Sequence, residues 1–395
     1  MVSVDKATRI VLENTPDSGP ETISVEKATG RVLLKAIVAD RDLPPFNRVT
    51  MDGIAIRWED YQNGIRKFNI KGIQFAGASP LDLEAEADCI EIMTGAVLSS
   101  TADCIVRYED LLISGTIAEV TVPCKKGQNI HFKGSDAKAG QVLVEENTCL
   151  RPAEIAVAAS VGATALTVRK LPRIVIISSG DEIVEIDKDP LPSEIRNSNA
   201  YCIASLLAQH GIVAGKLHIK DDKDASVTQI KAALLEYDVI LLCGGVSKGK
   251  KDFIPQALED AGVEKLFHQV NQRPGKPFWF GKRKNTVVFA LPGNPVSTFF
   301  CARRYLIPWL KKTLHQNPED HSWAVLSEDY TFNPTLSYFL QVKISEDKAC
   351  RVALPITGGG SGDFVNMVSA DGFLELPSKD ESLYKKGEVF KFWNF

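Results

Sequence analysis

The chain is predicted to be a multidomain α/β protein built around a doubly wound parallel sheet. Three short apolar runs support this prediction, at residues 173–177, 239–243 and 286–290, because strands buried on both faces of a parallel sheet are continuously hydrophobic. Helical segments lie between them, at about 198–206 and 224–235. A strand, helix, strand, helix order is typical of a doubly wound sheet with helices on both faces.

Composition and charge exclude several classes of protein. The 395 residues are 44% hydrophobic and 24% charged, with a net charge of −4, so a strongly basic nucleic-acid-binding face is not expected. No apolar run reaches membrane-spanning length, and the first residues lack a secretory signal pattern. The eight cysteines are scattered without a C-x-x-C pair, which argues against zinc or disulfides and favours a reducing cytoplasm.

The sequence predicts four domains, one of them discontinuous. Apolar residues at helical spacing near the N-terminus and again at 151–162 indicate a helical N-terminal domain formed by residues 1–42 and 138–170. Short alternating strands indicate an inserted β-rich domain at 43–137. The α/β domain then occupies 171–316, and a C-terminal β domain occupies 317–395.

A candidate anion site follows from the ends of the predicted parallel strands. Ligands of such sheets bind outside the carboxyl ends of the strands, where glycine lets backbone N–H groups approach an anion. Gly244 and Gly245 follow one strand directly. Basic residues lie nearby, with Ser247 and Asp252 among them: Lys248, Lys250, Lys251, Arg273 and Lys276. A phosphate pocket explains this pattern, and an ordinary turn beside a solvated basic face explains it equally well.

Convergence of several strand ends favours the pocket. Three predicted strands deliver Gly, Ser or acidic residues to the same edge of the sheet. Glu182, Asp221 and Asp252 would suit Mg²⁺, which binds a few carboxylates together with phosphate oxygens. Asp52, in contrast, is most simply a turn residue on pattern alone, because Gly53 follows it.

Six motifs, taken in order along the chain, closely resemble the molybdopterin molybdenumtransferases, the family that includes bacterial MoeA and the E domain of gephyrin. They are TMDGIAIR at 50–57, IMTGA at 92–96, SGDE at 179–182, GGVSKGKKD at 244–252, RPGKP at 273–277 and LPGNPVS at 291–297. The resemblance implies an Mg²⁺-assisted reaction that inserts molybdate into adenylyl-molybdopterin and releases AMP. It also implies a cytoplasmic homodimer whose cleft receives residues of the partner's inserted domain.

The resemblance also assigns site residues by position. Those implied to be catalytic are Asp52, Thr94, Asp136, Asp221 and Asp252. Those implied to bind substrate are Ser179, Glu182, Gly244, Gly245, Ser247, Arg273, Lys276, Pro292, Pro295 and Ser361. Glu182, Asp221 and Asp252 are implied to hold the metal, while Arg273 and Lys276 would hold phosphate or molybdate.

The chain departs from the family pattern at two positions where relatives often have a cationic residue. Gln269 stands where many relatives have lysine, and Gln341 stands where the C-terminal domain often carries arginine. Lysines 248, 250 and 251 are candidates to replace the lost charge. Alternative functions are molybdopterin adenylyltransfer, a tungstate-specific reaction and a gephyrin-like dimeric scaffold. Further partners implied are an adenylyltransferase and apo-molybdoenzymes, with no nucleic acid and no membrane.

Overall fold

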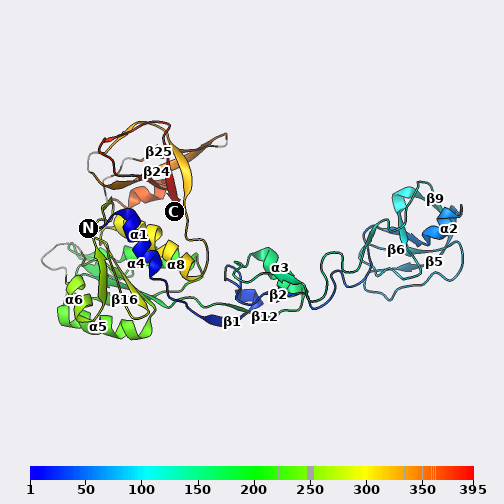
Figure 1. The fold of residues 1–395 in the computed structure, drawn as a ribbon, viewed down its shortest axis with the longest axis horizontal. Helices are drawn as coiled ribbons and strands as arrows, with labels where there is room; N and C mark the ends of the chain where they lie inside the picture. The colour runs from blue at the N-terminus through cyan, green and yellow to red at the C-terminus, as the bar shows by residue number, and fades with distance from the viewer. Residues whose placement is uncertain are drawn as a thin grey trace. The chain divides into compact units, whose positions relative to one another are not determined.

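The computed structural model describes residues 1–220, 222–246, 253–332, 335–348, 350–356, 358, 360 and 362–395. The chain divides into two compact units (Figure 1). The first unit comprises Met1–Thr22, Gly30–Val32 and Thr167–Phe395, and the second comprises Ile23–Thr29 and Leu33–Leu166. Strands β1 (Pro20–Ser24) and β12 (Ala165–Arg169) pair where the chain passes from one unit to the other.

The first unit contains the predicted α/β sheet, in the strand order β16-β13-β17-β21-β20-β18. Neighbours among the first four strands are parallel, and β20 and β18 continue the sheet as antiparallel strands. The α/β class is therefore confirmed, with an antiparallel pair added at one edge. The bounds are β13 (Ile174–Ser179), β16 (Gly215–Ile219), β17 (Val239–Cys243), β18 (Glu264–His268), β20 (Trp279–Arg283) and β21 (Thr286–Leu291).

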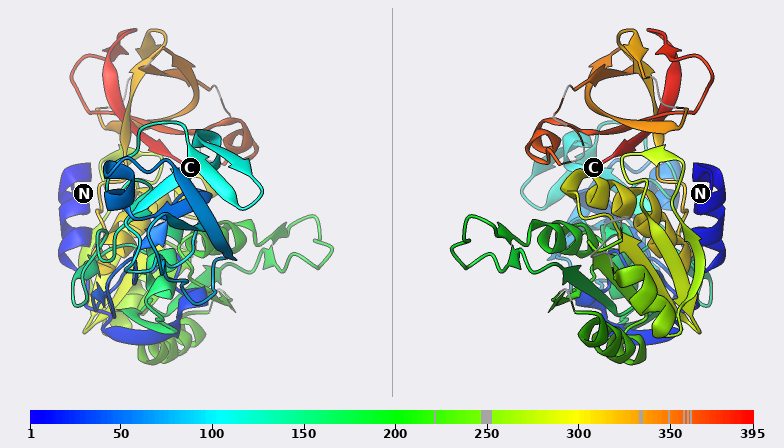
Figure 2. Two further views of the ribbon diagram at one scale, coloured as in Figure 1. Left: turned by 90° about the vertical axis from the view of Figure 1, so that its right-hand side faces the viewer. Right: turned by 90° about the vertical axis from the view of Figure 1, so that its left-hand side faces the viewer.

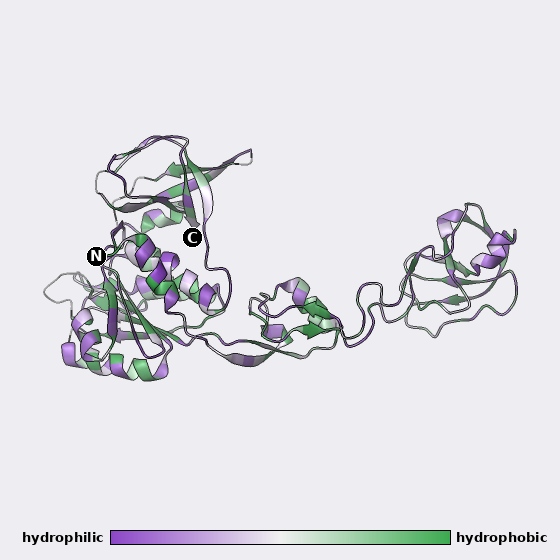
Figure 3. Ribbon diagram, in the orientation of Figure 1, coloured by the Kyte–Doolittle hydropathy of each residue, from purple (hydrophilic) through white to green (hydrophobic). Residues whose placement is uncertain are grey.

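Helices cover both faces of this sheet. Alternate strand residues point to opposite sides, and both sets are apolar, so each face is buried under helices. Ile174 and Ile176 share one apolar cluster with α4 (Ser198–Ala208), α7 (Pro295–Cys301) and α8 (Ile307–Thr313), which a π-helical turn, η3 (Ala302–Leu306), connects. Val175 and Ile177 share the other cluster with α5 (Lys223–Glu236) and α6 (Ile254–Asp260). Figure 3 shows the strands as largely hydrophobic and the covering helices as mixed.

Helix α1 (Val4–Glu13) also belongs to the first of these clusters. Its side chains Val4, Ala7 and Val11 are buried there, and the side chain of Ser3 caps the helix by accepting from the backbone N–H of Lys6. The sequence predicted an amphipathic helix here but assigned it to a separate helical domain. The predicted domain boundaries stay a prediction, although this helix packs against α8 of the α/β domain.

The C-terminal part of the first unit is a small barrel. Strands β24, β25, β22, β28 and β26 pair in that order, and β26 pairs with β24 again, which closes the ring around Leu326, Leu340 and Leu374. The short β19 adds to β24. The bounds are β19 (Gln272–Arg273), β22 (Ser322–Leu326), β24 (Ser337–Asp347), β25 (Cys350–Pro355), β26 (Gly372–Leu376) and β28 (Val389–Asn394).

The second unit is built mainly on a β sheet, in the order β7-β4-β6-β5-β9-β8. Alternate residues of β4 enter two apolar clusters, Ala55 in one and Ile54 with Ile56 in the other, so both faces of the sheet are packed. The bounds are β4 (Gly53–Ile56), β5 (Lys67–Gln74), β6 (Asp88–Ile92), β7 (Cys104–Arg107), β8 (Leu111–Ser114) and β9 (Ile117–Val120). Smaller elements of this unit are η1 (Val25–Lys27), β2 (Ile37–Val38), β3 (Arg48–Val49), α2 (Trp58–Gln62), η2 (Tyr108–Asp110), β10 (Ile130–His131), β11 (Val142–Val144) and α3 (Pro152–Ser160).

The remaining short elements lie in the first unit. The pair β14 (Ile183–Val184) and β15 (Ile195–Arg196), together with the loop that joins them, projects from the α/β domain (Figure 2, green). The others are β23 (Tyr330–Thr331), η4 (Val365–Ser369) and β27 (Leu383–Tyr384). No helix in the described part of the chain has the length and apolar character needed to cross a bilayer.

Candidate active site

A cavity of about 420 Å³ lies at the carboxyl ends of the parallel strands. The strand register aligns Ser178 of β13 with Cys243 of β17, and Cys243 with Leu291 of β21, so the three following turns meet at one edge. Six of the predicted site residues line this cavity: Ser179, Glu182, Gly244, Gly245, Pro292 and Pro295. The structure thus brings together residues that lie more than 100 positions apart in the sequence; their roles stay predictions.

The Gly244-Gly245 turn forms part of the cavity lining and requires glycine at both positions. Gly244 has φ of +99° and Gly245 has φ of +67°, a region that side chains other than glycine rarely occupy. A Cβ atom on Gly244 would lie 2.9 Å from the carbonyl oxygen of Ser179, and one on Gly245 would lie 2.6 Å from Cγ1 of Ile254. The turn therefore packs closely against β13 and α6 while its backbone lines the cavity.

The start of α4 supplies cavity residues that the sequence analysis did not select. Asn197 caps the helix by accepting from the backbone N–H of Ala200, and its buried side chain also accepts a 2.9 Å hydrogen bond from Ser178 Oγ. Asn199 donates through Nδ2 to the carbonyl oxygen of Gly293 at 2.8 Å. The sequence analysis recognised this helix start, but the strand-to-helix contacts of Asn197 and Asn199 arise only from the fold.

Cys243 also lines the cavity, at the end of β17. Its side chain is buried, and burial raises the pKa of its thiol to about 12. A thiol of this kind stays protonated at neutral pH and is a poor nucleophile. Cys243 therefore contributes shape rather than reactivity.

A second cavity, of about 230 Å³, adjoins the first through shared lining residues Pro277, Pro292 and Asn294. The predicted phosphate or molybdate ligands Arg273 and Lys276 line it. The glycine turn and the basic residues thus belong to neighbouring hollows of the same unit.

Gln272 supports the segment that carries these two cations. Its side chain is completely buried and donates through Nε2 to the carbonyl oxygen of Gly275 at 3.0 Å. The hydroxyl of Tyr305 donates to its Oε1. One amide thus links the turn that carries Arg273 and Lys276 to the core of the domain.

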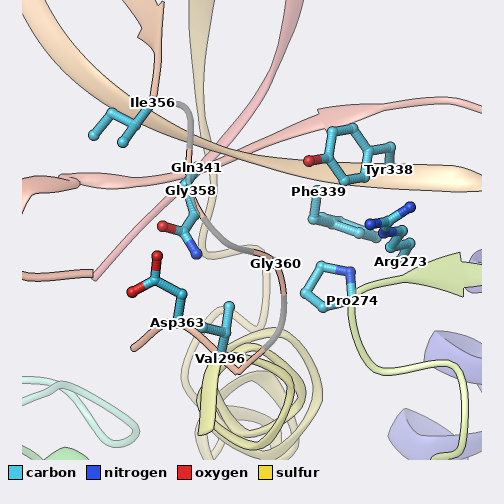
Figure 4. Close-up of a pocket in the computed structure, with 10 residues that line it drawn as sticks. All are labelled: Arg273, Pro274, Val296, Tyr338, Phe339, Gln341, Ile356, Gly358, Gly360 and Asp363. Atoms are coloured by element: carbon cyan, nitrogen blue, oxygen red, sulfur yellow. The ribbon is translucent and has the colours of Figure 1, made fainter. Parts of the chain in front are cut away.

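A third hollow, of about 60 Å³, adjoins the second through Arg273 and Pro274 and extends to the C-terminal barrel (Figure 4). Gln341 and Asp363 face each other across it. Tyr338 lines it as well and stacks on Phe332, with ring centroids 4.0 Å apart and planes 7° from parallel. The guanidinium of Arg273 lies 5.8 Å from the Phe332 ring centroid, which places the cation beside this aromatic pair.

Of the predicted metal ligands, only Glu182 lies within the described residues; Asp221 and Asp252 lie outside them, as do the predicted substrate residues Ser247 and Ser361. Glu182 is exposed, lines the first cavity and folds back toward Gly180. The described ranges contain no group of three His, Cys, Asp or Glu residues placed to hold a metal. A single carboxylate beside this cavity still fits Mg²⁺, which is often bound by one or two carboxylates plus substrate phosphates.

In the second unit, two predicted catalytic residues contact each other. Asp52 accepts through Oδ1 from the backbone N–H of Thr94 at 2.6 Å and from its hydroxyl at 2.7 Å. These hydrogen bonds, the backbone one first, lower the pKa of Asp52 from its ordinary value against a small opposing effect of desolvation. Asp52 is therefore a fixed carboxylate and more than the simple turn residue that its local pattern indicates.

Asp136, the third predicted catalytic residue of this unit, contacts a histidine that the sequence analysis did not select. Nε2 of His131 lies 2.7 Å from Oδ1 of Asp136, and Nδ1 of His131 lies 2.9 Å from a terminal nitrogen of Arg48. The spacing of five residues between His131 and Asp136 does not predict their contact, because the contact depends on the conformation of the turn between them. The structure thus adds His131 and Arg48 to the candidate residues.

The fold and the cavities define a multidomain α/β protein with a cavity at the carboxyl ends of the parallel strands of its sheet. Residues 175–312 match the family model described as "Probable molybdopterin binding domain". Residues 2–162 match "MoeA N-terminal region (domain I and II)", and residues 324–395 match "MoeA C-terminal region (domain IV)".

Known proteins are similar along the full length of the chain. A molybdopterin molybdenumtransferase of Synechocystis sp. is 39% identical over 399 residues, covering 100% of both chains. One from Staphylococcus epidermidis is 29% identical and covers 98% of this chain and 94% of its own. The crystal structure of the molybdopterin biosynthesis MoeA protein from Pyrococcus horikosii superposes with a TM-score of 0.83 at 28% identity, covering 100% and 99%. The chain belongs to the molybdopterin molybdenumtransferase family.

Proposed function

We propose that the chain inserts molybdate into adenylyl-molybdopterin and releases AMP, giving the molybdenum cofactor. The observation that carries this proposal is the cavity at the carboxyl ends of β13, β17 and β21. It lies in a chain that is 39% identical, over its whole length, to a protein named molybdopterin molybdenumtransferase. A diphosphate needs convergent backbone N–H groups and cations. The Gly244-Gly245 turn would supply backbone N–H groups other than that of Gly244, which donates to the carbonyl oxygen of Leu291 at 3.1 Å, and Arg273 and Lys276 in the adjoining hollow would supply the cations.

The remaining site residues are proposed in two groups. Ser179, Glu182, Gly244, Gly245, Ser247, Pro292 and Pro295 would bind and shape the site of adenylyl-molybdopterin, and Arg273, Lys276 and Ser361 its phosphate or molybdate end. Asp52, Thr94, Asp136, Asp221 and Asp252 would carry the chemistry. The first three belong to the inserted domain, so in a homodimer they would be supplied by the partner subunit, as the family resemblance implies.

Magnesium is the proposed cofactor, with Glu182, Asp221 and Asp252 as its ligands. When bound, Mg²⁺ would offset the negative charge that develops on the departing phosphate. Glu182 lies beside the cavity rather than inside the apolar core, so its carboxylate is available to a hydrated ion.

The third hollow, which we propose for the oxyanion, carries less positive charge in this chain than the family pattern implies. Arg273 is accompanied there by the neutral Gln341 and the acidic Asp363. We therefore propose that Arg273 and the neutral amide of Gln341 would bind molybdate in this hollow, while Lys276 adds its charge from the adjoining one.

Two alternative functions are less well supported. Molybdopterin adenylyltransfer would need little beyond the α/β domain, whereas this chain also matches the N-terminal and C-terminal MoeA regions. A gephyrin-like scaffold would not need Glu182, Gly244 and Gly245 around an open cavity. The partners we propose are a second copy of the chain, an adenylyltransferase and apo-molybdoenzymes, in the cytoplasm, where eight free cysteines would remain reduced.

Reconstitution of the reaction tests the proposal. Purified chain would be mixed with adenylyl-molybdopterin, Mg²⁺ and molybdate, and followed for AMP release and for activation of an apo-molybdoenzyme. We expect AMP release that depends on molybdate and is abolished by EDTA. Tight binding without turnover would favour the scaffold, and formation of adenylyl-molybdopterin with release of pyrophosphate from ATP and molybdopterin would favour adenylyltransfer. Repeating the assay with tungstate would define the oxyanion preference.

Single carboxylate variants make the metal assignment specific. We expect Asp252→Ala to abolish turnover and Glu182→Gln to raise the Mg²⁺ concentration needed for half-maximal rate by about tenfold or more. Glu264→Gln is the matched control. Strand β18 runs in the same direction as β21, and Glu264 is its first residue, so Glu264 lies at the amino ends of these strands, away from the cavity at the carboxyl ends. An Asp252→Ala variant with full activity would remove that residue from the proposed metal site.

A further inference from the structure

An arginine, a histidine and an aspartate form a hydrogen-bonded chain in the second unit. Arg48 and His131 are directly opposite each other in the antiparallel pair β3–β10, so their side chains share one face. A terminal nitrogen of Arg48 lies 2.9 Å from Nδ1 of His131, and Nε2 of the same ring lies 2.7 Å from Oδ1 of Asp136. The imidazole therefore bridges a cation and a carboxylate.

The two contacts of the imidazole define one tautomer of its neutral ring. An arginine guanidinium can only donate hydrogen bonds, so Nδ1 of His131 accepts from Arg48. The proton of the neutral ring is then on Nε2, which donates to Asp136. The donor that faces the Asp136 carboxylate is therefore fixed by the opposite side of the ring.

The backbone around Asp136 is also held in place. Backbone N–H groups of Asp136 and Ala137 both donate to the carbonyl oxygen of Leu43, at 2.9 and 3.1 Å. The N–H of Lys133 donates to Oδ1 of Asn47 at 2.9 Å. The loop that carries Asp136 is therefore fastened to the segment that leads into β3, and His131 then fixes the carboxylate itself.

The carboxylate of Asp136 remains accessible despite these contacts. His131 and Ser135 both bind Oδ1, at 2.7 and 3.3 Å, and the Asp136 side chain is 56% exposed. Within the part of the chain that the structure describes, Oδ2 takes no hydrogen bond. One oxygen is thus held by the protein while the other is left for a ligand.

We propose that His131, oriented by Arg48, is a positioning residue that holds the Asp136 carboxylate for catalysis. The inference rests on the proposed function, because it assigns His131 a role only through a catalytic Asp136. A misplaced catalytic group can cost about a hundredfold in rate. A single tautomer with a fixed donor prevents rotation of the carboxylate away from the reacting atoms.

A double-mutant cycle on the AMP-release assay tests this role. We expect Asp136→Asn to abolish most turnover and His131→Ala to lower kcat about a hundredfold with little change in KM. The double variant should be within about twofold of Asp136→Asn alone, because the two residues act as one unit. His131→Gln, whose amide N–H₂ can replace the Nε2 donor, should recover activity to within about threefold of the unaltered chain.

The outcomes separate this inference from the proposed function. If molybdate-dependent AMP release is absent from the unaltered chain, the proposed function itself fails. If Asp136→Asn is inactive but His131→Ala keeps its rate, only the positioning role is wrong. If His131→Ala lowers the rate further in the Asp136→Asn background, His131 does not act through Asp136. A full rate for Asp136→Asn would overturn the inference as well.

Nitrogen NMR of the imidazole provides a readout that needs no activity. The ¹⁵N signals of His131, assigned by their loss in His131→Gln, should report a protonated Nε2 and an unprotonated Nδ1 in the neutral ring. Arg48→Met combined with Asp136→Leu removes both contacts and should give a mixture of tautomers, whereas Arg48→Met alone should keep the Nε2–H form because Asp136 still accepts from it. A neutral ring protonated on Nδ1 in the unaltered chain, or a tautomer unaffected by the double variant, would overturn the arrangement that we infer.

Discussion

Thr94 donates both of its hydrogen bonds to the same carboxylate oxygen of Asp52. The backbone N–H and the hydroxyl of Thr94 lie 2.6 and 2.7 Å from Oδ1 of Asp52, across 42 positions of sequence. Two donors on one oxygen stabilise the ionised carboxylate and fix the direction of the other oxygen. This contact joins the TMDG and IMTGA motifs, which the sequence presents only as separate turns.

Replacement of Thr94 by valine should therefore raise the pKa of Asp52 part of the way toward its ordinary value of 3.8. The backbone hydrogen bond remains in this variant, so the shift should be incomplete. The folded-state pKa of Asp52 is depressed, so the stabilisation from Thr94 is present above the unfolded-state pKa and is lost as pH falls through the folded-state value. A carboxyl ¹³C titration of both proteins measures the shift; Thr94→Ser, which keeps the hydroxyl, is the control and should titrate like the unaltered chain.

The Gly244-Gly245 turn provides a test of the main cavity. Gly245→Ala should weaken binding of AMP or adenylyl-molybdopterin by about tenfold or more, because the new Cβ meets Ile254 at 2.6 Å and forces the turn to move. Gly387→Ala is the matched control: its φ is +90°, but a Cβ there meets nothing within 4 Å. In both variants backbone strain should lower the free energy of unfolding by about 1–2 kcal/mol, and only Gly245→Ala should bind the ligand more weakly. Equal affinities by calorimetry would show that the turn does not approach the ligand.

The two glutamines at family cation positions should behave differently. Gln341 lines the hollow with Arg273, so Gln341→Arg adds a cation there and should lower the KM for molybdate about fivefold or more. Gln269→Lys adds the same charge at a residue that lines none of the three cavities, and should leave this KM nearly unchanged.

Asp363 complicates the first of these expectations in a testable way. If the new arginine pairs with Asp363 instead of molybdate, Gln341→Arg alone will change little, and Gln341→Arg combined with Asp363→Asn will recover the gain. A large gain from Gln269→Lys would contradict the lining of the hollow, since that cation would then reach the oxyanion.

The main sheet and its glycine turns could be predicted because strands buried on both faces of a parallel sheet have continuous apolar sequences. The runs at 173–177, 239–243 and 286–290 are apolar on both faces, and β13, β17 and β21 are buried along their whole length. The convergence of Ser179, Gly244 and Pro292 then followed from the parallel direction of the strands. Asp52, Thr94 and Asp136 came only from the family resemblance, since turn residues carry no periodicity.

Other features could not be read from the sequence, for physical reasons that differ. The periodicity of α1 identifies Val4, Ala7 and Val11 as its buried face but does not say which sheet that face covers. The closure of the barrel by the β24–β26 pair depends on contacts between residues 30 to 38 positions apart in the sequence. The pairing of Arg48 with His131 depends on the register of β3 and β10, where a shift of one residue would separate the two side chains.

Gln272 gives a final prediction, on stability and activity together. Its buried amide donates to the carbonyl oxygen of Gly275 and accepts from the hydroxyl of Tyr305, so Gln272→Leu would leave the Tyr305 hydroxyl without this partner and the Gly275 carbonyl with only the weak 3.8 Å hydrogen bond from Cys301 Sγ. An unpaired buried polar group costs about 1–3 kcal/mol, and we expect a loss of about 1–4 kcal/mol in the free energy of unfolding. Tyr305→Phe removes only one partner and should cost less.

The same substitution should also reduce activity, because Gln272 supports the turn that carries Arg273 and Lys276. We expect Gln272→Leu to raise the KM for molybdate at temperatures where the protein is still folded, as verified by circular dichroism. Gln209→Leu, at an exposed position after α4, is the matched control and should alter neither quantity. A Gln272→Leu variant that is destabilised but keeps its KM would mean that the buried amide stabilises the domain without holding the two cations in place.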